Sequence, residues 1–243
     1  MKRHLPNLIT LLNLACGTAA IVLTLEGQWR WAVYLVLAAA VLDFLDGFAA
    51  RMLKAHSPMG KQLDSLADLV SFGVLPAVFI YVIFSGLFQS QPEDARSFYG
   101  PLQWVVLISI LLVPVFSAIR LARFNTEEDE GTFFHGLPTP AHALFWTGIF
   151  WQFMESGDIF GTAMNLFFMW AIMLIMAFHM ILPVPMYSLK FEHWRLRGNL
   201  IPYLLILLTV VILLITGLGG LPIVILVYIF LSLLNLLLAR RVV

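Results

Sequence analysis

Four aspartates lie close together in the sequence, at the junction of two strongly apolar segments. They are Asp43, Asp46, Asp64 and Asp68. The first pair is spaced i, i+3 and the second i, i+4, so on helices each pair lies on one face. A break at residues 56–60 lets the second helix fold back beside the first. We therefore expect the four carboxylates to converge on one small volume.

Four like charges beside a membrane need a positive partner. One aspartate at the centre of a bilayer costs about 2.5–3.5 kcal/mol on insertion scales. Mg²⁺ and Mn²⁺ prefer carboxylate oxygens, and two such ions can clamp a phosphoryl group. We expect the aspartates to bind two divalent ions, Mg²⁺ or Mn²⁺. Salt bridges to nearby Lys and Arg side chains are the simpler alternative, but they do not explain the small residues Gly47, Ala50 and Gly60 among the acids.

The pattern D-x-x-D-G-x-x-A-R-x8-G-x-x-x-D-x-x-x-D resembles the signature of the CDP-alcohol phosphatidyltransferase family. Every fixed position is filled, by Asp43, Asp46, Gly47, Ala50, Arg51, Gly60, Asp64 and Asp68. The resemblance implies metal-dependent transfer of a phosphatidyl group from CDP-diacylglycerol, with release of CMP. It also implies a homodimer built on a core of six membrane helices.

The resemblance further implies roles for individual residues. Asp43, Asp46 and Asp64 would bind the metal, and Asp68 would complete the metal site and act as the general base. The residues expected to bind CDP-diacylglycerol are Thr10, Asp46, Gly47, Ala50, Arg51, Gly60 and Ser65. In the first helix Asn7, Thr10 and Asn13 form a polar stripe that faces either a neighbouring helix or the ligand.

Two strings indicate the acceptor of the phosphatidyl group. The segments RLARFN at 120–125 and F-x-G-L-P-x-P-A at 134–141 resemble the branch of the family that transfers to L-serine. Paired guanidinium groups suit a carboxylate, so we expect Arg120, Arg123 and Asn125 to bind serine. Anchoring of the helix end by its positive charges is the alternative for the arginines. Glycerol 3-phosphate or inositol phosphate are the alternative acceptors.

The amino-acid composition predicts that these site residues belong to a membrane protein. Of 243 residues, 61% are hydrophobic and 12% are charged, and the mean hydropathy is +0.93. These values predict an all-α, polytopic transmembrane bundle of about eight helices, with six or seven as the alternative. The expected segments are 7–25, 31–53, 63–88, 101–122, 138–155, 161–182, 200–217 and 219–238. Residues 1–190 form the family-like core, and 191–243 add two helices to the same membrane domain.

Charge placement predicts the orientation. With eight spans, only Arg30 and Arg96 of the 14 basic residues fall on one side. The positive-inside rule then places both termini and the aspartates on the cytoplasmic side, and we expect a bacterial cytoplasmic membrane. The formal net charge of zero gives no basic field for nucleic acid. An ion-coupled transporter is the alternative class, but the acids cluster at one face and no internal repeat is evident.

Overall fold

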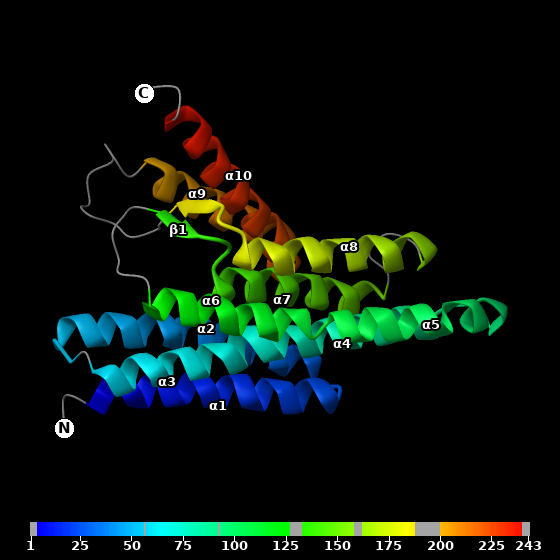
Figure 1. The fold of residues 1–243 in the computed structure, drawn as a ribbon, viewed down its shortest axis with the longest axis horizontal. Coiled ribbons are helices and arrows are strands. Elements are labelled where there is room, and N and C mark those ends of the chain that lie inside the picture. The colour runs from blue at the N-terminus through cyan, green and yellow to red at the C-terminus, as the bar shows by residue number, and fades with distance from the viewer. Residues whose placement is uncertain are drawn as a thin grey trace.

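The computed structural model describes residues 4–55, 57–91, 93–126, 133–157, 162–187 and 200–239. Long helices lie side by side in a bundle, and α10 crosses the others obliquely (Figure 1). The elements are α1 (Leu5–Leu25), α2 (Trp29–Met52), α3 (Pro58–Asp68), the π-helical segment η2 (Leu69–Val74), α4 (Leu75–Gln89), α5 (Glu93–Ser109), α6 (Leu112–Thr126), β1 (Phe133–His135), α7 (Thr139–Ser156), α8 (Thr162–Ile181), β2 (Pro185–Tyr187), α9 (Leu200–Thr216), η3 (Gly217–Gly220) and α10 (Leu221–Ala239). The all-α class is confirmed, and each of the eight expected segments corresponds to a helical stretch.

Five helical stretches of the described residues are long and apolar enough to cross a membrane. They are Leu5–Leu25, Trp29–Met52, Pro58–Gln89, Gly100–Thr126 and Pro202–Leu234. The last of these contains both α9 and α10, because the short η3 joins them without a gap. Such stretches, together with the shorter apolar helix Leu166–Ile181, make the chain an integral membrane protein.

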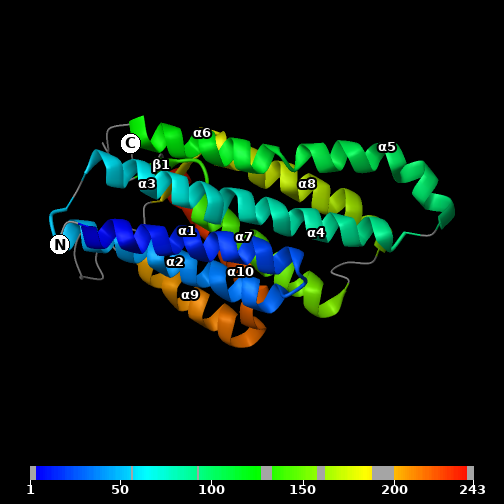
Figure 2. The same cartoon turned by 90° about the horizontal axis from the view of Figure 1, so that it is seen from below.

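The turns that connect the helices lie at the two ends of the bundle. The start of α1, the turn between α2 and α3, and the end of α6 gather at one end, and α5 extends to the other (Figure 2). All the elements that carry the predicted site residues therefore meet at one end of the bundle.

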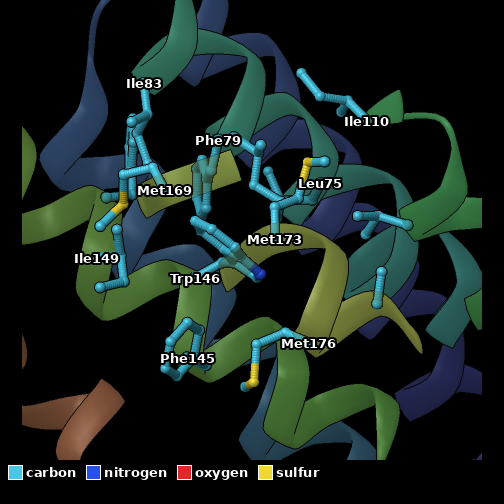
Figure 3. Close-up of a cluster of buried hydrophobic side chains, with 14 of the residues drawn as sticks. Leu75, Phe79, Ile83, Ile110, Phe145, Trp146, Ile149, Met169, Met173 and Met176 are labelled. Atoms are coloured by element: carbon cyan, nitrogen blue, oxygen red, sulfur yellow. The ribbon is translucent and has the colours of Figure 1, made fainter. Parts of the chain in front are cut away.

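A buried apolar core between α4, α7 and α8 holds the bundle together (Figure 3). Phe79 of α4 stacks on Phe150 of α7 with ring centroids 4.2 Å apart. Trp146, Met169 and Met173 are fully or almost fully buried beside them. Each aromatic pair of this kind adds about 0.5–1.5 kcal/mol beyond the area that it buries. The core fixes α4, which continues directly from the aspartate-bearing α3.

Local sequence explains the turn that joins α2 to α3. Lys54 takes a left-handed backbone conformation, with φ of 49°, just after α2 ends. The Ser57 side chain then caps α3 by accepting a hydrogen bond from the Gly60 amide at 3.0 Å. Pro58 follows at the first position of the helix, where its missing N–H costs nothing. The expected fold-back is confirmed, and α3 begins earlier than the expected segment 63–88.

The π-helical segment η2 follows Asp68 without interruption. Pro76 explains its position, because a proline ring clashes with the carbonyl four residues earlier and removes one helical hydrogen bond. A π turn accommodates one extra residue, and such turns are frequent at functional sites. The sequence did not predict this segment.

Two further features complete the described fold. β1 and β2 pair antiparallel, with Phe134 opposite Met186. The predicted division between 1–190 and 191–243 falls at residues outside the described ones, so it stays a prediction.

Candidate metal centre and nucleotide pocket

The turn between α2 and α3 brings three of the four aspartates together. Asp43 of α2 and Asp64 and Asp68 of α3 each offer one carboxylate oxygen, and these oxygens all lie within 4.8 Å of one another. Asp46 lies outside this group of three, but its charge acts on all three of the others. The expected convergence is therefore confirmed for three acids, and the fourth is a close neighbour.

The chemistry of this cluster fits a divalent cation. Asp46 and Asp68 are buried, and Asp64 Oδ1 is a buried atom without a hydrogen-bond partner among the described residues. Among the described residues none of the four carboxylates forms an ion pair, so the alternative of salt bridges to nearby Lys and Arg finds no support there. Buried carboxylates without a cation are costly, and hard cations bind such oxygen clusters. The cluster can therefore hold a divalent metal ion.

Helix α1 supplies hydrogen bonds to two of the acids. The Thr10 hydroxyl lies 2.7 Å from Asp46 Oδ2 and 3.0 Å from the Pro6 carbonyl, and the Asn13 amide donates to Asp68 Oδ1 at 3.3 Å. The polar stripe of α1 thus faces the acids. Thr10 was predicted as a site residue. Asn13 was seen only as part of the stripe, although its spacing from Thr10 by one turn was the signal for it.

Asn13 also fixes the chain that follows Asp68. Its backbone carbonyl accepts a hydrogen bond from the Ser71 hydroxyl in η2 at 3.1 Å. One turn further along α1, a Cβ added to Gly17 would collide with the Ser71 side chain, so α1 and η2 are in backbone contact there. Asn13 therefore contacts both Asp68 itself and the segment that follows it, next to the point where α1 and η2 meet.

A cavity of about 680 Å³ opens beside the acids. Its described lining is Pro6, Asn7, Thr10, Asp46, Gly47, Ala50, Arg51, Ala55, Ser57, Pro58, Gly60, Lys61, Asp64 and Phe124. Six of the seven residues predicted to bind the donor are in this lining. The exception is Ser65, whose hydroxyl accepts a hydrogen bond from the Asn125 amide at 2.7 Å.

Glycines keep the cavity open at two points. A Cβ at Gly47 would have open space around it, with only Arg51 Nη1 3.9 Å away. A Cβ at Gly60 would lie 3.0 Å from Ser57 Oγ and 3.1 Å from Asn7 Oδ1. A side chain at Gly47 would therefore project into the cavity, whereas one at Gly60 would crowd the cap of α3.

The three residues predicted to bind serine point to different partners. Arg120 Nη1 donates to Thr139 Oγ1 at 2.9 Å, Arg123 Nη1 donates to the Ile181 carbonyl at 3.0 Å, and Asn125 contacts Ser65. Arg120 is the one that lies within electrostatic range of Asp68. Its Nε is a buried atom without a hydrogen-bond partner among the described residues. Arg120 therefore differs from Arg123 and Asn125 in its surroundings.

Comparison with known proteins shows which family and which relatives the chain resembles. Residues 3–184 match the family model of CDP-alcohol phosphatidyltransferase. A Mycobacterium bovis protein named CDP-diacylglycerol–serine O-phosphatidyltransferase is 39% identical over 173 residues, which cover 68% of this chain and 55% of the relative. A Bacillus subtilis protein of the same name is 35% identical over 137 residues, covering 56% of this chain and 70% of that protein.

An archaeal relative, the archaetidylserine synthase of Methanothermobacter thermautotrophicus, is 38% identical over 146 residues, covering 58% of this chain and 54% of that protein. The chain spans about half the length of the mycobacterial relatives that it matches. The family match covers most of the chain, including all four aspartates and the cavity. The chain belongs to the CDP-alcohol phosphatidyltransferase family.

Proposed function

We propose that this protein transfers the phosphatidyl group of CDP-diacylglycerol to the hydroxyl of L-serine, giving phosphatidylserine and CMP. The observation that carries the proposal is the cluster of Asp43, Asp64 and Asp68 beside a cavity at one end of a membrane bundle. The names of the relatives support serine as the acceptor.

The cavity would receive the CDP group of the donor. Gly47 and Ala50 leave room for the cytidine and its ribose, and Arg51 provides a cation for a phosphate. The Thr10 hydroxyl and the neighbouring Asp46 are placed to orient the nucleotide. Ser65, which lies outside the described lining of the cavity, would act through its contact with Asn125. The lipid chains of the donor would remain in the bilayer.

Asp43, Asp64 and Asp68, together with Asp46, would hold the divalent ions, proposed to be two and to be Mg²⁺ or Mn²⁺. When bound, such ions neutralise the diphosphate and the charge that develops on the departing CMP. Asp46 would face the nucleotide as well, because it lines the cavity together with Asp64, whereas Asp43 and Asp68 do not appear in the described lining.

Asp68 would act as the general base. The serine hydroxyl oxygen attacks the phosphorus that carries the diacylglycerol, its proton passes to an Asp68 oxygen, and the bond from that phosphorus to the CMP oxygen breaks. Asn13 donates a hydrogen bond to Asp68 Oδ1, which would orient this base from a neighbouring helix.

Arg120 would bind the serine carboxylate. Its Nη1 is held by Thr139, and its Nε–H points to no partner among the described residues, so one edge of the guanidinium can receive a carboxylate. Arg123 and Asn125 would assist only after leaving their contacts with Ile181 and Ser65. Arg120 would therefore be the main serine ligand of the predicted three.

The proposal includes a location and an assembly. We place the protein in the bacterial cytoplasmic membrane, with both termini and the aspartates on the cytoplasmic side, because of the distribution of Lys and Arg. We also propose a homodimer, and a family-like core of 1–190 to which 191–243 add two helices of the same membrane domain.

The test is CMP release from CDP-diacylglycerol by the purified protein in detergent micelles. Serine, glycerol 3-phosphate and inositol phosphate are offered in parallel, with Mg²⁺ or Mn²⁺ and with EDTA, and a CDP-activated archaeal lipid is run as a second donor. We expect release that needs both metal and serine. Metal-dependent release with another acceptor alone would disprove serine as the substrate.

A matched set of variants tests the metal centre. Asp64→Asn and Asp68→Asn should abolish CMP release, and Asp64→Asn should also reduce the rise in melting temperature that Mn²⁺ or Mg²⁺ produces. Glu26→Gln removes an exposed acid at the end of α1 and should change neither quantity. Full activity in either aspartate variant would contradict the proposed metal site.

A further inference from the structure

Three hydrogen bonds form a closed ring between α3 and the end of α6. The Lys61 ammonium of α3 donates to the Asn125 carbonyl of α6 at 2.7 Å, and the Asn125 side-chain amide donates to the Ser65 hydroxyl of α3 at 2.7 Å. The Ser65 hydroxyl in turn donates to the Lys61 carbonyl, one turn back on α3, at 3.3 Å. Ser65 and Asn125 were predicted to bind different substrates, so the ring joins one residue of each predicted set.

The ring holds the end of α6, where helix geometry leaves carbonyls without partners. The last four carbonyls of an α-helix accept no hydrogen bond within the helix. Asn125 is the last residue but one of α6, and an ammonium is favourable there because it faces the negative end of the helix dipole. Arg120 and Arg123 lie shortly before it on the same helix. The ring therefore fixes against α3 the helix end that carries the predicted serine ligands.

Lys61 also belongs to the cavity proposed for the CDP group. It is exposed and lines this cavity together with Arg51 of α2 and Phe124 of α6. An ammonium has three N–H donors, and the bond to Asn125 uses one of them. Within the part of the chain that the structure describes, Lys61 forms no ion pair. Its charge and its other donors are thus available to an anion in the cavity, and lysine is a common ligand of phosphate.

Capping of α6 is the simpler explanation of the contact between Lys61 and Asn125. However, α6 already has a cap of its own, because the Thr126 hydroxyl lies 3.2 Å from the Ala122 carbonyl and 2.9 Å from the Arg123 carbonyl. Water can also satisfy the carbonyls of an exposed helix end. A lysine from another helix is therefore not required as a cap, whereas its position links the cavity to α6.

We propose that Lys61 is shared by the two substrate sites. Its ammonium binds a phosphate of the CDP group, and its bond to Asn125 holds the end of α6 in position for the acceptor. This inference rests on the proposed function and deepens it. Lys61 is a ligand of the donor and, through Asn125, a positioning residue for the acceptor. In this arrangement Asn125 contributes to acceptor binding without leaving Ser65.

Binding of CDP and of cytidine to the purified protein, with Mg²⁺ present, tests the donor half of the inference. Cytidine lacks the phosphates, so Lys61→Met should raise the Kd of CDP about tenfold or more and leave the Kd of cytidine unchanged. Lys61→Arg keeps the charge and should lose less. The exposed Lys54 lies just beyond α2 and outside the described cavity lining, so Lys54→Met is the matched control and should change neither Kd. An unchanged Kd of CDP in Lys61→Met, or an equal rise for CDP and cytidine, would overturn the inference.

The KM for serine tests the acceptor half. Ser65→Ala opens the ring, and it should raise the KM for serine about threefold or more while the Kd of CDP stays the same. Lys61→Met should raise the KM for serine as well, at saturating CDP-diacylglycerol. Ser90→Ala is the control, because the Ser90 hydroxyl bonds to the Leu87 carbonyl at the end of α4, and both values should be unchanged. Melting temperatures show whether each variant is folded. An unchanged KM for serine in either Lys61→Met or Ser65→Ala would contradict the positioning role.

Failure of the proposed function is visible separately, in the unaltered protein. Binding of CDP needs no acceptor, so the comparison with cytidine decides the role of Lys61 even if no acceptor supports CMP release. If an acceptor other than serine supports release, the KM for that acceptor takes the place of the KM for serine. If CDP does not bind to the unaltered protein in the presence of Mg²⁺, the inference is wrong together with the proposed nucleotide site.

Discussion

Replacing Asn13 by alanine tests how Asp68 is held. The amide of Asn13 donates to Asp68 Oδ1, and a hydrogen bond to a charged group contributes about 1.5–3 kcal/mol. The distance of 3.3 Å is long for such a bond, so the lower part of this range applies. Because about 1.4 kcal/mol corresponds to a factor of ten in rate, Asn13→Ala should lower kcat about tenfold.

The same substitution should have little effect on stability. Asn13 Oδ1 is a buried atom without a hydrogen-bond partner among the described residues, so removing the amide also removes a desolvated group. Asn13→Asp keeps the size but replaces the donor by a fifth carboxylate, and its kcat should fall further than that of the alanine variant. We therefore expect a loss of activity with a nearly unchanged melting temperature.

The assay is CMP release at saturating substrates and metal, with melting temperature in the same detergent. Thr24→Val is the control, because Thr24 is also buried on α1 but its hydroxyl bonds to the Ala20 carbonyl at the other end of the helix. A kcat for Asn13→Ala within twofold of the unaltered protein would refute this account of Asp68.

Two further substitutions test the cavity and the crossing of helices. Gly47→Leu should raise the KM for CDP-diacylglycerol about tenfold or more without lowering the melting temperature, because the new side chain enters open space beside Arg51; an unchanged KM would mean that the nucleotide binds elsewhere. Gly17→Ala should destabilise the protein by about 1–3 kcal/mol, because its methyl group meets Ser71, whereas the exposed Thr18→Ala should not. Thermal unfolding in detergent compares Gly17→Ala and Thr18→Ala with the unaltered protein. A melting temperature of Gly17→Ala equal to that of the unaltered protein would show that the crossing has room for a methyl group.

The sequence predicted those parts of the site that depend on spacing along one helix. Asp64 and Asp68 are one turn apart, and Asp43 precedes a turn whose capping residues can be read directly, so their convergence follows from helix geometry. The same applies to Thr10, which lies on the polar stripe of α1. The all-α, polytopic class followed from hydropathy alone.

The parts that depend on the rotation of one helix against another could not be predicted. Arg120 and Arg123 are one turn apart and seemed equivalent, but packing directs Arg120 to Thr139 and Arg123 to the Ile181 carbonyl. The involvement of Asn13 with Asp68 depends in the same way on how α1 crosses α3.

The π turn after Asp68 changes how this stretch of sequence should be aligned and engineered. An α-helix turns by about 100° per residue, so the one extra residue of a π turn rotates everything beyond it by about that angle. This phase shift lets Asp64 of α3 line the cavity while Leu75 and Phe79, further along the same continuous rod, face the apolar core. Deleting a single residue between 69 and 74 would therefore preserve hydropathy and every motif. It would nevertheless rotate the helix after the deletion, relative to the helix before it, by about 100°.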